Sequence, residues 1–231
     1  MNEDLSRRGT LAGLAVLALS APALGQQAGA PPFAVTEPGP ETPRPLPGER
    51  AIGREDAPVT VIEFHSLTCG NCANFHTQHF PRIKVAYVDP GLVRFVLRDY
   101  PLDRVAVDAA ALVHCAGPER FEAMLSVLYT NKEAWAHSPD ARGWLRRMAG
   151  LAGVSASRLE ACWTDRGFTD PIIRSRLEAT REFNVQATPT FVIGGRVHPG
   201  VLTFERFAQL VQPLLPPSST PAPAPRVLPR L

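Results

Sequence analysis

The feature that most constrains this chain is a buried-strand pattern that runs directly into a pair of cysteines. The stretch PVTVIEFH (58–65) is dense in apolar and β-branched residues, which is typical of a central strand covered on both faces. The stretch LTCGNCANFHTQHFPRIKVAYV (67–88) then changes to helical spacing, so Cys69 and Cys72 fall where the strand ends and the helix begins. A second apolar stretch, LVRFVLRDY (92–100), predicts a parallel strand and completes a βαβ unit.

A block of helices follows this unit, and strands return only near the end. Apolar residues recur at helical spacing from about 101 to 183. In TPTFVIGGRVHPG (188–200) the glycine pair Gly194–Gly195 predicts a hairpin turn, and TFERFAQLV (203–211) predicts a closing helix capped by Thr203. The order predicts an α/β sheet interrupted by a helical insertion.

Proline and capping residues predict local features of these helices. Pro81 predicts a kink in the first helix, because proline removes a backbone donor. In TDPIIRSRLEATREF, a cap at Thr169 or Asp170 predicts the start of the last helix of the block.

The two ends of the chain predict an exported protein with one folded domain. The pair Arg7–Arg8 precedes a short apolar run and small residues, which is the layout of an export signal over residues 1–30. The arginine pair suits the twin-arginine route, with an ordinary secretory signal as the alternative. Proline-rich segments predict a linker at 31–48 and a disordered tail at 213–231, so the folded domain covers 49–212.

Export places the cysteines in an oxidising compartment, which we expect to be the bacterial periplasm. Four cysteines among 231 residues are too few for a disulfide scaffold, and we interpret them as two pairs with separate roles. The net charge of +2 comes without a dense basic stripe, so nucleic acid is not expected as a partner.

Metal binding and a structural bridge are the two alternatives to redox chemistry at the Cys-x-x-Cys pair. A zinc site needs four ligands, commonly from a second close pair, but Cys115 and Cys162 are far apart in sequence. The histidines His65, His76 and His79 keep a metal-binding or copper-delivery protein open as an interpretation, although we expect no metal. A bridge across so short a loop constrains the unfolded chain little, which weakens the structural alternative.

The position of the pair favours redox chemistry. A cysteine at a helix N-terminus faces free backbone N–H groups and the positive end of the helix dipole, so Cys69 is predicted to be the nucleophile. Cys72, one turn further in, is placed to attack a mixed disulfide on Cys69. Glu63 interrupts the apolar strand six residues before Cys69. A buried carboxyl exchanges protons closer to neutral pH, although Glu63 as a hydrogen-bonded structural acid is the alternative.

Together these motifs resemble the thioredoxin superfamily, and the helical block makes the chain similar to the DsbA-like thiol:disulfide oxidoreductases. The resemblance covers about 50–212 and rests on EFHSLTCGNC and ATPTFVIGG. It implies a thioredoxin-like fold with an inserted helical domain and a redox-active cysteine pair. It also implies a cis Pro189, preceded by Thr188, against the cysteines, and Glu63 as proton acceptor for Cys72. We assign the histidines no catalytic role.

The resemblance further implies a periplasmic enzyme that introduces disulfides into reduced, exported client proteins. A DsbB-type membrane partner would reoxidise it, and no cofactor is expected. The isomerases of the superfamily are similar to a thioredoxin-like domain that is joined to a dimerisation domain. In this chain a proline-rich linker precedes the core instead, so we expect a monomer that acts in the oxidase direction. The dipeptide between the cysteines is Gly70–Asn71, which carries no charge, whereas the DsbA motif is Cys-Pro-His-Cys. We therefore expect the Cys69 thiolate to be stabilised less than the thiolate of DsbA. Reduction or isomerisation therefore stays open as the alternative.

Cys115 and Cys162 are predicted to form a second, structural disulfide. Each lies one turn after a leucine of its own helix, Leu112 and Leu159, beside an apolar stripe where two helices can pack. The oxidising compartment allows the bond, and some DsbA-like proteins resemble this chain in carrying an extra pair in the helical domain. Two buried free thiols are the alternative.

Overall fold

The computed structural model describes residues 50–217 and 219 of the chain. The predicted export signal (1–30), the linker (31–48) and all but the first residues of the predicted tail lie outside the described residues. In the described part, no helix combines the length and the apolar character needed to cross a bilayer. The predicted domain end at residue 212 falls inside a 3-10 turn, Gln212–Leu214, so the last turn of the fold uses residues that the sequence assigned to the tail.

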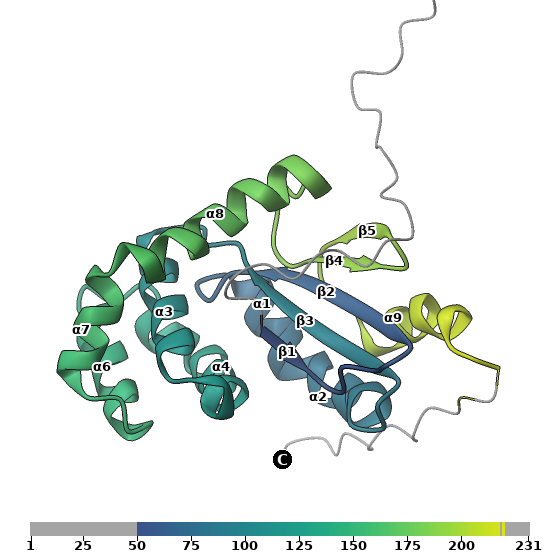
Figure 1. The fold of residues 1–231 in the computed structure, drawn as a ribbon, viewed down its shortest axis with the longest axis horizontal. Coiled ribbons are helices and arrows are strands. Elements are labelled where there is room, and N and C mark those ends of the chain that lie inside the picture. The colour runs from purple at the N-terminus through teal and green to yellow at the C-terminus, as the bar shows by residue number, and fades with distance from the viewer. Residues whose placement is uncertain (1–49, 218, 220–231) are drawn as a thin grey trace, which may run out of the picture. The chain divides into compact units, whose positions relative to one another are not determined.

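In the described residues a five-stranded mixed sheet has the order β1-β3-β2-β4-β5 (Figure 1). The strands are β1 (Arg50–Ile52), β2 (Val59–His65), β3 (Val93–Asp99), β4 (Thr190–Ile193) and β5 (Arg196–Pro199). The central strand β2 pairs in parallel with β3 and antiparallel with β4, and the β4–β5 hairpin and β1 form the edges. The parallel pair and the hairpin confirm the predicted α/β class; β1 was missed because three residues carry no readable period.

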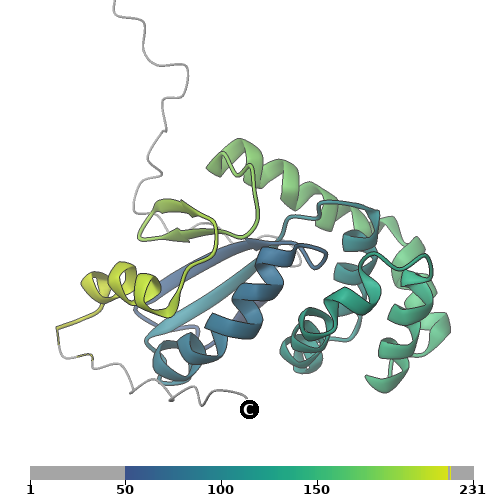
Figure 2. The ribbon, with the colours of Figure 1, turned by 180° about the vertical axis from the view of Figure 1, so that it is seen from behind.

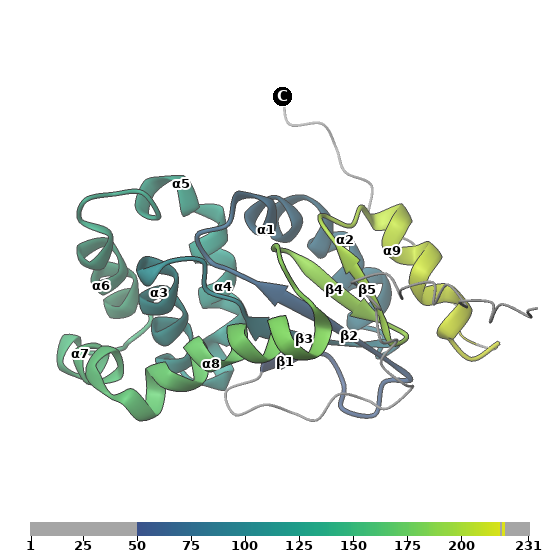
Figure 3. The same cartoon turned by 90° about the horizontal axis from the view of Figure 1, so that it is seen from above.

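Helices lie on both sides of this sheet and beside it. They are, in chain order, α1 (Gly70–Asn74), the π-helical turn η1 (Phe75–His79), α2 (Phe80–Ile83), the π-helical turn η2 (Lys84–Val88), α3 (Arg104–Cys115), the 3-10 turn η3 (Pro118–Arg120), α4 (Phe121–Thr130), α5 (Lys132–Trp135), α6 (Ala141–Leu151), α7 (Ala156–Thr164), α8 (Arg166–Phe183), α9 (Phe204–Val211) and the 3-10 turn η4 (Gln212–Leu214). Figures 2 and 3 show α1, α2 and α9 on one side of the sheet and the end of α8 on the other, with α3, α4, α6 and α7 gathered beside it. The predicted helical insertion is thus present between β3 and β4.

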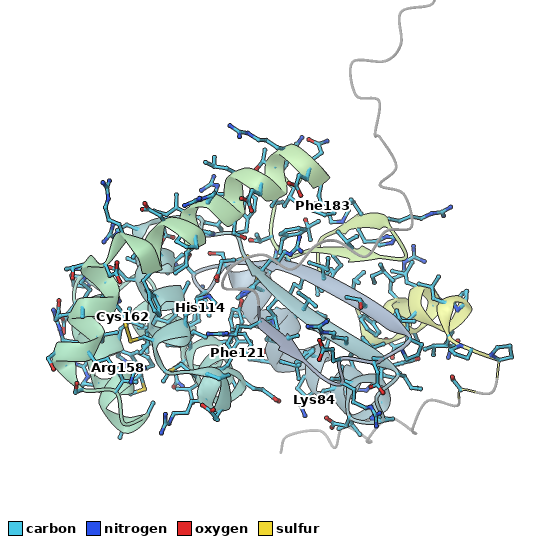
Figure 4. All side chains as sticks on the ribbon, in the orientation of Figure 1. Lys84, His114, Phe121, Arg158, Cys162 and Phe183 are labelled. Atoms are coloured by element: carbon cyan, nitrogen blue, oxygen red, sulfur yellow. A yellow bond between two sulfur atoms is a disulfide. The ribbon has the colours of Figure 1, made fainter. Side chains whose placement is uncertain are left out.

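The alternation of side chains along β2 separates two buried layers. Phe64 faces α8, where its ring centroid lies 5.3 Å from that of Phe183 (labelled in Figure 4). Val61 belongs to the layer on the opposite face, beneath α1. Because successive strand residues point to opposite faces, Glu63 and His65 share the face of Val61 and lie in the layer beneath α1.

Two sequence-based expectations concern the geometry of the helices. Where Pro81 predicts a kink, the chain stays helical from 70 to 88, with a π-helical turn on either side of α2. Pro81 lies in the first turn of α2, where a missing backbone donor costs little. The predicted start of α8 at Thr169 or Asp170 is wrong, because Asp165 caps the helix one turn earlier by accepting from Gly167 N at 2.8 Å.

A disulfide joins the end of α3 to α7, and Figure 4 shows it beside the label of Cys162. The Cα atoms of Cys115 and Cys162 lie 6.2 Å apart, within the about 7 Å that a bridge allows. Both residues are buried. The Trp163 indole, which donates to the Asp108 carbonyl at 2.8 Å, connects the same two helices. The insertion is therefore cross-linked through its own core rather than to the sheet.

We expect replacement of both Cys115 and Cys162 by alanine to lower the free energy of unfolding by about 2–4 kcal/mol, because the bridge closes a loop with a sequence separation of 47. Denaturant unfolding of the oxidised wild type and the double variant measures this difference. Equal stability, or alkylation of both thiols in the non-reduced wild type, would contradict it.

Candidate active site

Cys69 caps the first helix of the fold. Its backbone is extended, with φ −77° and ψ 124°, and its sulfur accepts from the backbone N–H of Cys72 at 3.5 Å. A turn closed by Cys69 N donating to Ser66 O at 3.1 Å joins the end of β2 to this cap. The strand therefore delivers a partly exposed thiol to the N-terminal end of the helix, where free N–H groups stabilise a thiolate.

The two cysteines have opposite electrostatic surroundings. The pKa of Cys69 is lowered to about 5, mainly by a hydrogen bond from the Cys72 thiol, and backbone N–H groups of Cys72 and Asn71 add to the shift against the effect of partial burial. Cys72 has no exposed surface, and burial raises its pKa well above the usual value, with the hydrogen bond to Cys69 and the charge of Glu63 acting in the same direction. At neutral pH the reduced pair is thus a Cys69 thiolate beside a Cys72 thiol.

The Thr188–Pro189 segment lies directly against Cys69. The peptide bond between the two residues is cis, and the Cys69 thiol donates to the Thr188 carbonyl at 3.3 Å across a sequence separation of 119. The segment enters β4, which pairs with β2, so the sheet itself brings this distant loop to the cysteines. The Thr188 hydroxyl is buried and has no hydrogen-bond partner among the described residues.

Glu63 lies on the central strand with none of its surface exposed. Its neighbours across the sheet are apolar, Leu97 on β3 and Phe191 on β4. One carboxylate oxygen, Oε2, lies 2.8 Å from Nε2 of His76, whereas Oε1 is buried without a hydrogen-bond partner in the described part of the chain. The acid is therefore paired on one side and open on the other.

More ionisable groups continue this buried layer toward the helical insertion. Tyr129 of α4 stacks on His76 with ring centroids 4.5 Å apart, and its hydroxyl lies 2.7 Å from Nδ1 of His65. Burial raises the pKa of Tyr129 well above its usual value and lowers the pKa of His65, so a neutral phenol and a neutral imidazole share this hydrogen bond.

Asp99 of β3 ends the layer. Burial raises the pKa of its carboxyl, but the charge and hydrogen bond of His114, 2.6 Å away, together with His65, outweigh this and leave the pKa below its usual value. Figure 4 shows His114 where the helices of the insertion meet the sheet. The layer thus extends from Glu63 to the contact between the two parts of the fold.

Sequence reasoning missed the contribution of the insertion to the site. Asp103, the N-cap of α3, accepts from the Thr68 hydroxyl at 2.8 Å and so ties the residue before Cys69 to the insertion. Lys132 of α5 is buried, pairs with Glu133 at 2.8 Å, and lies so close that a methyl group at Gly70 would be 3.7 Å from its Nζ. No sequence signal identifies these contacts, because they depend on how the helices pack.

The three histidines considered as metal ligands have separate surroundings. His76 is bonded to Glu63, His65 to Tyr129, and His79 is only partly buried. Among residues 50–217 and 219, no group of three or more histidine, cysteine, aspartate or glutamate side chains is arranged to hold a metal ion.

Comparison with known proteins places this site among similar folds. The profile of a family described as Thioredoxin matches residues 46–213. The Rickettsia bellii protein named "Putative protein-disulfide oxidoreductase" is 26% identical over 148 residues, or 64% of this chain and 57% of that protein. Disulfide bond formation protein D of Bacillus subtilis is 24% identical over 72% of this chain and 77% of its own length. The crystal structure of Wolbachia pipientis alpha-DsbA1 is similar with a TM-score of 0.68 and 27% identity, over 74% of this chain and 92% of that one. The chain spans 53–57% of the length of the Rickettsia relatives.

We expect the alkylation of reduced protein at Cys69 to follow a titration with a midpoint near pH 5, because only the thiolate reacts and the pKa of Cys69 is lowered to about 5. Iodoacetamide rates between pH 3 and 8, with peptide mapping, measure it: the rate should rise through pH 5 and stay level above. A midpoint near the ordinary value of about 8.5, or faster labelling of Cys72, would contradict the assignment.

Proposed function

The chain belongs to the thioredoxin family, in the DsbA-like form with a helical insertion, and from this premise we propose that it exchanges disulfides with exported proteins through Cys69 and Cys72. The observation that carries the proposal is the contrast between the two thiols, one partly exposed with a lowered pKa and one buried with a raised pKa. The contrast fits an attack site on the surface and a resolving thiol behind it.

The proposed reaction begins from the Cys69–Cys72 disulfide. A client thiolate attacks Cys69 Sγ; the Cys69–Cys72 bond breaks, and Cys72 leaves with the bonding electrons and takes up one proton. A second client thiolate then attacks the client sulfur of the mixed disulfide and releases Cys69 as a thiolate. The client has lost two electrons to form its disulfide, and the cysteine pair has gained them. Glu63 is the proposed proton donor and acceptor for Cys72.

We propose the oxidase direction, because stabilising the Cys69 thiolate stabilises the reduced pair and so makes its disulfide a stronger oxidant. A pKa of about 5 lies between the values of about 7 in thioredoxin and about 3.5 in DsbA. The order agrees with the uncharged Gly70–Asn71 dipeptide, since backbone and thiol hydrogen bonds remain as stabilising groups. Reduction or isomerisation of disulfides is the alternative.

The proposed setting is the periplasm, reached through a signal in residues 1–30, with the remaining folded domain acting as a monomer. The Arg7–Arg8 pair and the apolar run after it support export, and the twin-arginine route is part of the proposal. The partners would be reduced, exported client proteins and a membrane reoxidant of the DsbB type, because each turnover leaves the cysteine pair reduced.

We expect the redox potential of the Cys69–Cys72 pair, equilibrated against glutathione at pH 7, to lie between about −270 mV for thioredoxin and about −120 mV for DsbA. The intermediate pKa of Cys69 is the reason for the intermediate value. A potential at or below that of thioredoxin would reject the oxidase direction and favour the reductase alternative.

Serine variants separate the proposed roles of the two thiols. Cys69→Ser should abolish oxidation of a reduced client peptide, whereas Cys72→Ser should accumulate mixed disulfides through Cys69, because the resolving thiol is absent. Non-reducing mass spectrometry after incubation with an oxidised client peptide measures the adduct, and the variant lacking both thiols is the control. Adducts formed through Cys72 in the Cys69→Ser variant at the same rate would reverse the roles.

A further inference from the structure

A buried histidine lies behind the proposed proton acceptor. His76 follows Cys72 by four residues, so both side chains lie on the helix face that packs on β2. His76 belongs to the π-helical turn η1, and its Nε2 lies 2.8 Å from Glu63 Oε2. Cys72, Glu63 and His76 are all buried, and Glu63 lies close enough to Cys72 for its charge to raise the pKa of that thiol, so we treat the three groups as one buried cluster.

The surroundings of this cluster offer the Glu63 carboxylate few hydrogen-bond donors other than His76. Aromatic rings enclose His76: the ring centroids of Phe75, Phe80 and Tyr129 lie 5.2, 5.1 and 4.5 Å from its own. A buried carboxylate is costly unless hydrogen bonds stabilise it, and the bond to His76 is the one that Glu63 side-chain oxygens make in the described residues.

The other ionisable groups of the layer point away from Glu63. Tyr129 on α4 directs its hydroxyl to His65 on β2, and His65 lies 3.8 Å from Asp99 on β3. Asp99 in turn binds His114 on α3 at 2.6 Å. These bonds use the polar groups nearest to the cluster.

We propose that His76 is a positioning residue for the thiol–disulfide exchange: its Nε2–H holds Glu63 Oε2 and leaves Oε1 as the open site that exchanges a proton with Cys72. The inference rests on the proposed function, because it deepens the role of Glu63 in that reaction. A histidine in this place also stabilises the carboxylate form of Glu63, since a hydrogen bond to a charged acceptor is stronger than one to a neutral acid.

The proton transfer balances at each step. When the Cys69–Cys72 disulfide opens, Cys72 leaves as a thiolate, the proton on Glu63 Oε1 moves to Cys72 Sγ, and Glu63 becomes a carboxylate held by His76. When a mixed disulfide on Cys69 is resolved, Cys72 returns the proton to Oε1 and attacks the Cys69 sulfur, and the partner thiolate leaves. His76 keeps its own proton throughout and acts by favouring the carboxylate between the two steps.

The test measures how fast Cys72 resolves the mixed disulfide between Cys69 and glutathione, between pH 6 and 8. In this mixed disulfide Cys69 is bonded to glutathione and does not ionise, so the pH dependence of the resolution step belongs to Cys72 and its proton acceptor. His76→Leu removes the donor, which makes the Glu63 carboxylate less stable. We expect the rising limb to move up by about one pH unit, or about tenfold slower resolution on that limb.

Two matched variants complete the test. His76→Gln keeps an N–H donor at this position and should restore the profile to near wild type. His79 lies in the same π-helical turn but has no bond to Glu63, so the His79→Leu variant should leave the pH profile unchanged. If His76→Leu and His79→Leu give the same profile, the inference is wrong.

A second measurement needs no variant and no client. In wild-type protein oxidised with diamide or reduced with dithiothreitol, the 15N resonance of the His76 imidazole should differ, because the proposed transfer moves a proton between Glu63 and Cys72 when the pair changes state. An unchanged resonance overturns the inference even if His76→Leu fails to fold. A changed resonance in a protein that exchanges no disulfide with clients supports it while rejecting the proposed function.

Discussion

The arrangement of the site depends on a carboxyl group that is buried in the central strand. Glu63 has apolar neighbours on both adjacent strands, and an isolated charge in such a place costs several kcal/mol. The cost is reduced by His76, which is buried in the same layer and bonded to one oxygen. The second oxygen has no partner among the described residues, so the compensation is incomplete, and the charge of Glu63 acts on the pKa of Cys72. A purely structural acid would gain from a second donor there.

The helical insertion contributes side chains that contact the site. Asp103, the N-cap of its helix α3, accepts a hydrogen bond from the residue before Cys69, and its helix α4 supplies Tyr129, which stacks on His76. The insertion carries its own cross-link between Cys115 and Cys162, distant in the chain from the redox pair. Its internal stability therefore supports the geometry of a site whose reactive groups all come from the other part of the fold.

Much of this arrangement was readable from the sequence, and the family resemblance and the α/β fold with inserted helices are confirmed. Periodicity located β2, β3 and the hairpin because each has at least four residues with a clear pattern, whereas β1 has three and was missed. The predicted cap of α8 at Thr169 or Asp170 was wrong, because Asp165 already caps the helix one turn earlier. The role of His76 was not assigned, although its spacing of four residues from Cys72 was visible. Only the structure, in which α1 and η1 cover β2, shows that this spacing brings His76 to Glu63.

The two thiols, three residues apart on one helix, divide the chemistry between surface and interior. Cys69 ends the strand-to-helix turn, and hydrogen bonds from Cys72 and the helix backbone lower its pKa. Cys72 lies beneath it with no exposed surface, where burial, the hydrogen bond to Cys69 and the charge of Glu63 raise its pKa. Disulfide exchange can then occur at Cys69, which a client can reach. Proton transfer takes place in the buried layer, where a few fixed contacts set the pKa values of the groups involved. Because no charged residue lies between the cysteines, the stabilisation of the Cys69 thiolate depends on the reduced pair itself, and it is lost when the disulfide forms.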